Sequence, residues 1–140
     1  MPVNLTVARI EQLLAEAGAS SISKDYEAGS LSALSFRISV PNGKPMTIRL
    51  PANANAVFDT MQKEVMRPRK HTMDRLRDQA GRTAWKLMQD WVAVQISLIK
   101  MQQADVLQVF LPYLWDGEHT FYHHLKVGGF KQLPAPKAEG

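Results

Sequence analysis

The sequence predicts an α+β domain in which a three-stranded antiparallel sheet packs against a long central helix with two or three shorter helices. Three observations carry this prediction. An N-terminal segment has apolar residues at helical spacing. Apolar and polar residues then alternate over residues 34–50, on both sides of an Asn-Gly pair that suits a tight reversal. A long helical pattern follows from Thr72 to about Gln103.

Length and composition predict one domain and exclude several classes of site. The chain has 140 residues, 45% of them apolar, and no cysteine. We expect a single α+β domain over residues 1–131 and a disordered tail over 132–140, which holds two prolines. Without cysteine there are no disulfides, thiolate nucleophiles or cysteine-ligated metal centres. No apolar run fits a membrane span or a signal peptide, so we expect a cytoplasmic protein.

The N-terminal half predicts a helix followed by the sheet. The helix covers residues 5–17 and ends before Gly18. The segment from Ser20 to Tyr26 is expected to pair beside the hairpin 34–50, which completes a meander with one apolar face. The other face of this sheet carries the basic residues Arg37, Lys44 and Arg49.

The next segments predict two helices in succession. Asn53 or Asn55 caps the first of them, and Arg67-Pro68-Arg69 ends it, because the residue before a proline disfavours helical geometry. Thr72 is the expected N-cap of the long helix, which would measure on the order of 45 Å. Further along, Asp105 is expected to cap a short helix that Pro112 ends.

The long helix carries two apolar stripes when its residues are placed at 100° intervals. The first stripe is assigned to the core and consists of Met73, Leu76, Ala80, Ala84, Leu87, Trp91, Val94 and Leu98. The second stripe, Trp85, Val92 and Ile96, is expected to be an interface, or else part of the core. Its cover could be the sheet, residues 106–113, or the same helix in another subunit.

Positive charge is concentrated in one window of the chain. The net charge is +4, but residues 63–86 alone hold eight basic and three acidic residues and sum to +5. A phosphate backbone could bind such a surface. An ordinary solvated helix face is the alternative, since Asp78 and Arg82 are spaced for an intrahelical ion pair. The predicted surface for nucleic acid or an acidic partner comprises Arg67, Arg69, Lys70, Arg75, Arg82 and Lys86.

Arg77 differs from the other basic residues of this window. Its helical angle places it toward the core side of the long helix. A buried arginine needs a carboxylate partner, for which Asp25 and Asp59 are candidates. Otherwise its long side chain extends outward and keeps the guanidinium in water.

The sequence contains little that matches known catalytic or metal-binding motifs. His119, His123 and His124 stand near Asp116, but flanking glycines and the β-prone segment 120–122 predict an edge strand or loop there rather than a helix. No nucleophile elbow, phosphate loop or dinucleotide fingerprint occurs. We therefore assign no catalytic residue, no metal and no cofactor. A small hydrolase or nuclease using residues 116–124 is the weakest alternative.

Part of the chain resembles small uncharacterised proteins encoded by bacteriophages and prophages. The helix Ala84-Trp85-Lys86 through Asp90-Trp91 to Gln95 is followed by Val109-Phe110-Leu111-Pro112-Tyr113. In those proteins an "A-W-K/R-x-x-x-D-W-x-x-A-Q" helix likewise precedes "V-F-L-P-Y", and Val94 here replaces the second alanine. Leu50-Pro51-Ala52 is similar too, so the resemblance spans most of residues 7–122. It implies a mobile-element origin and brings no catalytic residue.

These observations predict a non-enzymatic accessory protein of a phage or prophage, in the host bacterial cytoplasm. Its expected partner is nucleic acid or a host or phage nucleoprotein complex, as for a counter-defence factor, bound through the basic helix face. The alternative is a protein–protein interaction module or homodimer that uses the stripe of Trp85, Val92 and Ile96. No membrane partner is expected.

Overall fold

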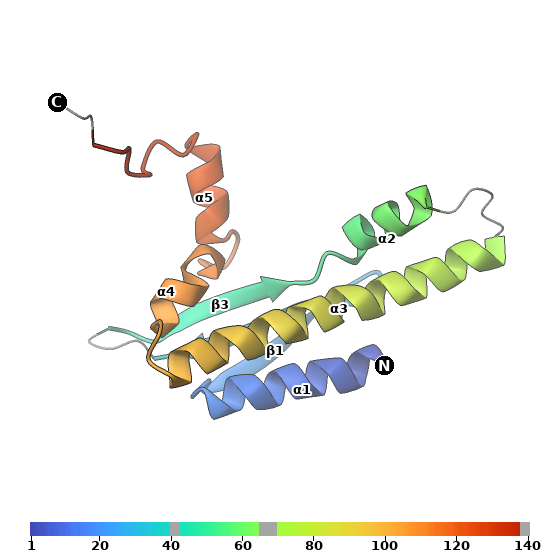
Figure 1. Ribbon diagram of the computed structural model, residues 1–140, viewed down its shortest axis with the longest axis horizontal. Helices are drawn as coiled ribbons and strands as arrows, with labels where there is room; N and C mark the ends of the chain where they lie inside the picture. The colour runs from blue at the N-terminus through green and yellow to red at the C-terminus, as the bar shows by residue number, and fades with distance from the viewer. Residues whose placement is uncertain (40–42, 65–69, 138–140) are drawn as a thin grey trace.

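The computed structural model describes residues 1–39, 43–64 and 70–137, without the side chains of Lys70 and His71. It confirms the α+β class, with a three-stranded antiparallel sheet and a 31-residue helix (Figure 1). Four shorter α-helices occur in the described residues, rather than two or three. The elements in chain order are α1 (Val3–Glu16), β1 (Ser21–Glu27), β2 (Ser30–Ile38), β3 (Met46–Pro51), α2 (Ala54–Lys63), α3 (Lys70–Lys100), α4 (Val106–Phe110), the 3-10 turn η1 (Leu111–Tyr113) and α5 (Phe121–Val127).

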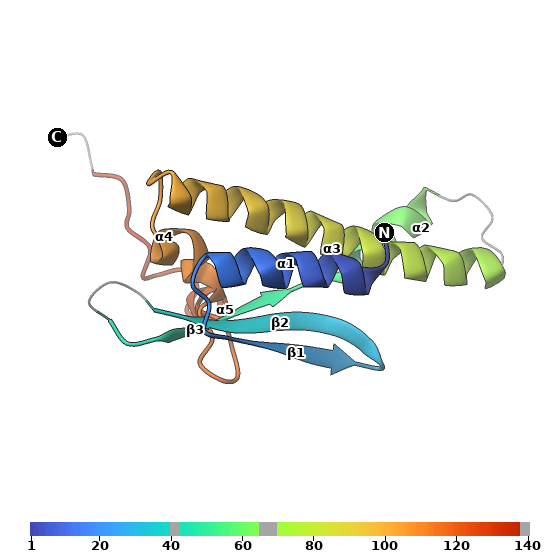
Figure 2. The ribbon, with the colours of Figure 1, turned by 90° about the horizontal axis from the view of Figure 1, so that it is seen from below.

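The core lies between the sheet and a layer formed by α1 and α3 (Figure 2). The strands follow the order β1-β2-β3, and Phe36 of β2 pairs with Ile22 on one side and Ile48 on the other. Because side chains alternate across a strand, Leu34, Phe36 and Ile38 share the inner face, and all three are buried. Arg37 lies exposed on the outer face, as the alternation predicts.

Local signals set the ends of α1 and α2. Gly18 has φ +98°, a left-handed conformation that glycine adopts without strain, and the N–H of Ala19 donates to the Leu14 carbonyl at 3.0 Å. Asn53 caps α2, since its side chain accepts the N–H of Ala56 at 3.0 Å. The predicted stop at Arg67-Pro68-Arg69 lies outside the described residues, and α2 ends earlier, at Lys63.

The assignment of the two stripes of α3 was wrong in part. Trp85, Val92 and Ile96, the predicted interface, are only 0–2% exposed and belong to the core cluster with α1 and the sheet. By contrast, Leu87 and Val94 of the predicted core stripe are 59% and 56% exposed. The physical reason is that periodicity identifies the apolar sides of a helix but contains no information on which element covers each side.

The first half of the predicted core stripe is confirmed in part, since Met73 and Leu76 are half-buried. Ala80 and Ala84 are buried, and α2 packs against this N-terminal half of α3 (Figure 1). Helix α3 begins at Lys70, before the predicted cap Thr72, and ends at Lys100. Of the covers considered for the second stripe, the structure shows the sheet and Phe110 of residues 106–113. Helix α1, which was not among them, packs on the same cluster.

The C-terminal segment contains one confirmed helix and one that was not predicted. Asp105 caps α4 with a capping box, in which its carboxylate accepts the Gln108 N–H at 2.7 Å. The edge strand or loop predicted at residues 120–122 is wrong, because Thr120 caps α5 by accepting the His123 N–H. Residues 132–137 form no helix or strand, and disorder over 132–140 stays a prediction. Among the described residues, no helix has the length and apolar content of a membrane span.

Candidate functional site

The basic window of residues 63–86 begins at the end of α2 and continues along the first half of α3. Helix α2 ends at Lys63 and α3 begins at Lys70, and this end projects beyond the sheet and α1 (Figures 1 and 2). Residues 63–77 hold six basic and two acidic residues, a net charge of +4 that equals the charge of the whole chain. We call residues 63–77 the basic tip. Arg67, Arg69 and the side chain of Lys70 lie outside the described part of the structure.

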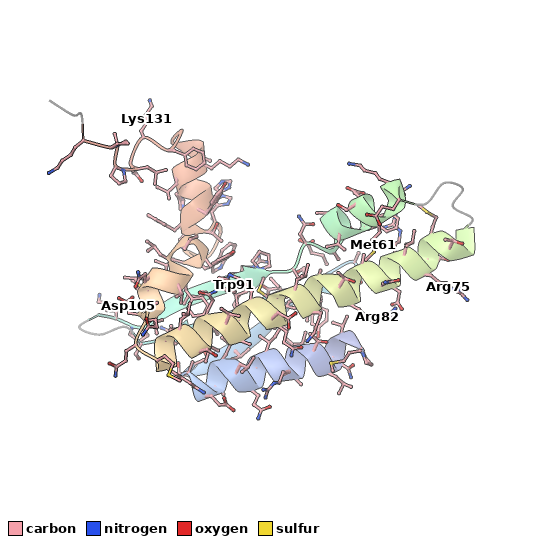
Figure 3. All side chains as sticks on the ribbon, viewed as in Figure 1. Met61, Arg75, Arg82, Trp91, Asp105 and Lys131 are labelled. Carbon is pink, nitrogen blue, oxygen red and sulfur yellow. The ribbon has the colours of Figure 1, made fainter. Side chains whose placement is uncertain are left out.

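Within the described part of the basic tip, Arg75 is exposed. Figure 3 shows Arg75 and Arg82 on the side of α3 that faces away from α2. Helix α2 therefore leaves these two predicted binding residues accessible. An extended ligand lying along this side of α3 would meet Arg75 first and Arg82 two turns later.

Two members of the predicted basic surface, Arg82 and Lys86, form ion pairs with acidic residues of α3. Arg82 lies 2.6 Å from Asp78, and Lys86 lies 3.1 Å from Asp90, both as intrahelical pairs. These pairs reduce the local positive charge beyond the tip, in line with the alternative of a solvated face. An exposed ion pair of this kind stabilises a protein by only about 0–1 kcal/mol. A phosphate group could therefore replace the carboxylate as the partner of Arg82 or Lys86. Of the six predicted binding residues, Arg82 and Lys86 therefore have acidic partners on α3 itself.

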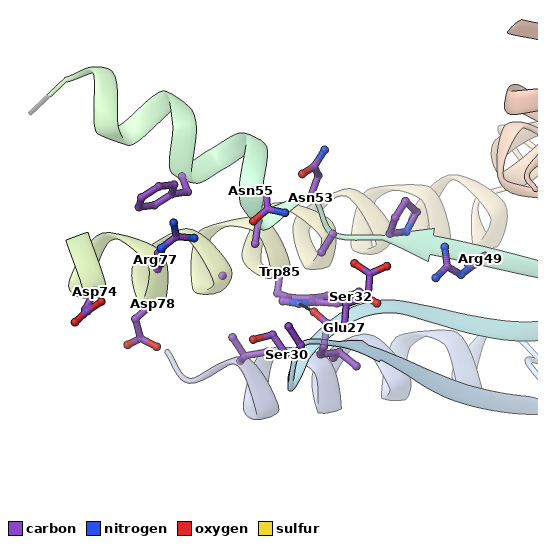
Figure 4. Close-up of a pocket in the computed structure, with 18 residues that line it drawn as sticks. Glu27, Ser30, Ser32, Arg49, Asn53, Asn55, Asp74, Arg77, Asp78 and Trp85 are labelled. Atoms are coloured by element: carbon purple, nitrogen blue, oxygen red, sulfur yellow. Dashed lines mark hydrogen bonds between the residues drawn. The ribbon is translucent and has the colours of Figure 1, made fainter. Parts of the chain in front are cut away.

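Arg77 takes neither of the two acidic partners considered for it. Its guanidinium lies 4.2 Å from the centre of the Phe58 ring, in a cation–π contact across the α2–α3 interface (Figure 4). Asp25 instead pairs with Arg49 at 3.2 Å. Arg77 is exposed and extends outward along the aromatic ring, so the outward orientation is confirmed.

A cavity of about 850 Å³ opens between the β1–β2 turn, the β3–α2 connection and the first half of α3 (Figure 4). Trp85 lines this cavity, and its Nε1 donates to the Leu31 carbonyl at 3.3 Å. Several polar lining groups serve the fold, since Asn53 caps α2 and the Ser32 hydroxyl donates to the Asp25 carbonyl at 3.1 Å. The sequence contains no signal for this cavity, because distant segments form it together.

The histidine cluster fastens α5 to the preceding turn. The Asp116 carboxylate accepts the backbone N–H groups of His119 and Glu118, each at 2.8 Å, and its other oxygen lies 2.6 Å from His124 Nε2. These bonds hold the pKa of Asp116 well below its usual range, because they stabilise its charged form. The bond from the His119 N–H contributes most, followed by those from Glu118 and His124. His119 and His123 stack with ring centres 4.1 Å apart.

This cluster gives no support to the hydrolase or nuclease alternative. Although α5 brings His123 and His124 into a helix, contrary to expectation, their partners are local: a stacked ring and the Asp116 carboxylate. Among the described residues, no three His, Asp or Glu side chains are arranged to hold a metal ion. The role that the geometry shows for Asp116 is to secure a turn.

Comparison with protein-family models, curated proteins and solved structures finds no match for this chain. The resemblance to phage and prophage proteins stays a prediction.

Proposed function

We propose that the protein is a non-enzymatic nucleic-acid-binding protein that contacts a phosphate backbone through the basic tip. The observation that carries this proposal is that the end of α2 at Lys63 and the first turns of α3 project beyond the sheet and α1. In the sequence, residues 63–77, which include these two helix ends, have a net charge of +4. Lys and Arg side chains that neutralise phosphates supply most of the affinity of a protein for a nucleic-acid backbone.

The residue types of the basic tip suit phosphate. Four of its six basic residues are arginines, whose planar guanidinium can donate two hydrogen bonds to one phosphate group. The first turn of α3 contains no acidic residue that would oppose an anion, and the helix dipole favours negative charge at this end. Positive side chains and the helix end therefore favour the same kind of ligand.

The proposed ligand is a duplex rather than a single strand. No Phe, Trp or Tyr occurs among residues 63–77, so the tip lacks the aromatic groups on which unpaired bases stack. Contacts to the phosphate backbone do not distinguish one base from another. We therefore expect the protein to bind duplexes with weak sequence preference. The phage resemblance is consistent with an accessory role in a nucleoprotein complex.

The salt dependence of binding tests this proposal. If Arg67, Arg69, Lys70 and Arg75 each neutralise one phosphate, log K should fall against log[salt] with a slope of about −3.6. Raising the salt concentration from about 50 to about 200 mM should then weaken binding roughly 150-fold. Fluorescence anisotropy with end-labelled duplex DNA, duplex RNA and single-stranded DNA measures this slope. Absence of binding to all three at low salt, or an affinity that salt leaves unchanged, would contradict the proposal.

A further inference from the structure

The cavity beside Trp85 is large enough for a small molecule and has apolar walls. Its volume of about 850 Å³ falls within the range of roughly 300–1,000 Å³ that is usual for ligand pockets. Four apolar residues that retain exposed surface line it from different segments: Val3 of α1, Leu31 of β2, Pro51 of β3 and Ala52 of the β3–α2 connection. An apolar molecule in the cavity would therefore cover surface that the fold leaves open to water.

Gly81 keeps the α3 wall of this cavity open. Glycine inside a helix is less favourable than alanine, because its backbone loses more conformational freedom on folding. Outside the adjoining helix backbone, no atom of the described residues lies within 4 Å of the position that a Cβ would take at Gly81. Contacts within the described part of the chain therefore do not require glycine here. Gly81 lines the cavity, so its missing side chain leaves room there.

Both basic residues of the cavity wall are held by other parts of the chain. Arg49 pairs with Asp25 at 3.2 Å and also lies 4.7 Å from the centre of the Trp115 ring. Arg77 lies 4.2 Å from the centre of the Phe58 ring, and Figure 4 shows it between α3 and α2. Each guanidinium is thus already engaged, by a carboxylate or by an aromatic ring.

Acidic residues outnumber basic ones on the wall, and Glu27 is open to a new partner. The wall carries Glu27, Asp74 and Asp78 against the two arginines, which gives a net charge of −1 in a chain of net charge +4. Asp78 is already paired with Arg82 at 2.6 Å. Glu27 is exposed and forms no ion pair with any described residue. Figure 4 shows it on the sheet side of the cavity, opposite α3.

We propose that this cavity binds a small organic cation, an amine with an apolar body, whose ammonium group lies beside Glu27. The apolar walls and the space at Gly81 accommodate the body. An ammonium group donates charge-assisted hydrogen bonds to a carboxylate, and these are stronger than hydrogen bonds between neutral groups. An anion would instead meet a wall of net negative charge, which opposes its binding. The proposal does not rest on the proposed function, since it needs no nucleic acid.

Two pairs of small molecules test the sign of the ligand charge. Phenethylamine and tryptamine are amines with an apolar ring, and hydrocinnamate and indolepropionate are carboxylates of similar shape. In two-dimensional NMR of the isotope-labelled full chain, at least one amine should shift the signals of the Gly81 amide and the Trp85 indole N–H. We expect that amine to bind at least about tenfold more tightly than its carboxylate counterpart. The proposal is overturned if neither amine shifts these signals, or if the carboxylates bind as tightly as the amines.

Glu27→Gln tests the assigned contact. This variant removes the charge and keeps the shape, so the affinity for the amine should fall at least about threefold. Glu118→Gln is the matched control, because Glu118 is exposed in the turn before α5 and does not line the cavity. Equal losses in the two variants, or no loss in Glu27→Gln, would contradict the proposal.

Two variants of Gly81 test whether the ligand uses the space at α3. Gly81→Ala should raise the melting temperature, because alanine favours the helix and its methyl group meets no described atom outside the adjoining helix backbone. It should also weaken binding of the amine slightly. Gly81→Leu extends further into the cavity and should weaken binding at least about tenfold, with circular dichroism showing that it folds. If both variants fold and bind the amine as tightly as wild type, the proposed site is wrong.

Discussion

Replacement of Trp85 with alanine is expected to lower the free energy of unfolding by about 3–5 kcal/mol. The side chain is 1% exposed and belongs to the core cluster that joins α1, the sheet and α3. Its indole N–H also donates to the Leu31 carbonyl, so the variant loses packing and leaves that carbonyl without its donor. Urea unfolding followed by circular dichroism measures the change.

Trp85→Phe is the matched variant, because it keeps an aromatic ring and removes the indole N–H. It should cost roughly half as much as the alanine substitution, since most of the buried apolar area is retained. A loss below about 1 kcal/mol for Trp85→Ala would be typical of a surface position and would contradict the core assignment.

The triple variant Arg69→Glu, Lys70→Glu, Arg75→Glu is expected to weaken duplex binding at least about 100-fold at low salt. It replaces three attractive charges in the basic tip with repulsive ones and changes the net charge of the chain from +4 to −2, since 4 − 6 = −2. Its slope of log K against log[salt] should also become shallower by about three. Fluorescence anisotropy with duplex DNA and RNA measures both quantities.

A second triple variant provides the control for net charge. Arg9→Glu, Lys126→Glu, Lys131→Glu changes three exposed basic residues outside the basic tip and produces the same total of −2, again 4 − 6. We expect its affinity to stay within about threefold of wild type at moderate salt, because charges beyond a Debye length are screened. Equal losses in the two variants would mean that overall charge, and not the tip, governs binding.

The sheet and several helix ends were predictable because their causes are local. Alternation over residues 34–50 defines one apolar face whatever covers it, and β2 and β3 pair accordingly. Asn53 and Asp105 act through hydrogen bonds to N–H groups three residues away, so sequence alone identifies them as caps. Thr120 uses the same chemistry for α5, but the β-prone residues after it concealed the signal.

The covers of α3 were not predictable, because they depend on tertiary arrangement. Both stripes are apolar at helical spacing, and only the path of the chain decides that Val92 faces the core while Val94 faces solvent. The cavity beside Trp85 has the same origin, since its walls come from segments that are distant in sequence. Periodicity determines the sides of a helix, whereas packing determines which side is buried.

The candidate site was predictable in composition but not in placement. The excess of basic residues around Arg75 is countable from the sequence, and so is the Asp78–Arg82 spacing that the structure realises at 2.6 Å. The Lys86–Asp90 pair has the same four-residue spacing, so the sequence already contained its signal. The projection of the α2 and α3 ends beyond the sheet needed the structure. Together they narrow the proposed contact surface to the start of α3.

Amide hydrogen exchange in the presence and absence of duplex tests most directly whether nucleic acid binds at the basic tip. At low salt, binding should slow exchange in the first turns of α3, over residues 72–77, and in the last turn of α2 near Lys63. Exchange in α5 and in β1 should not change. Protection confined to α5 or the sheet, with none at the start of α3, would contradict the proposed site.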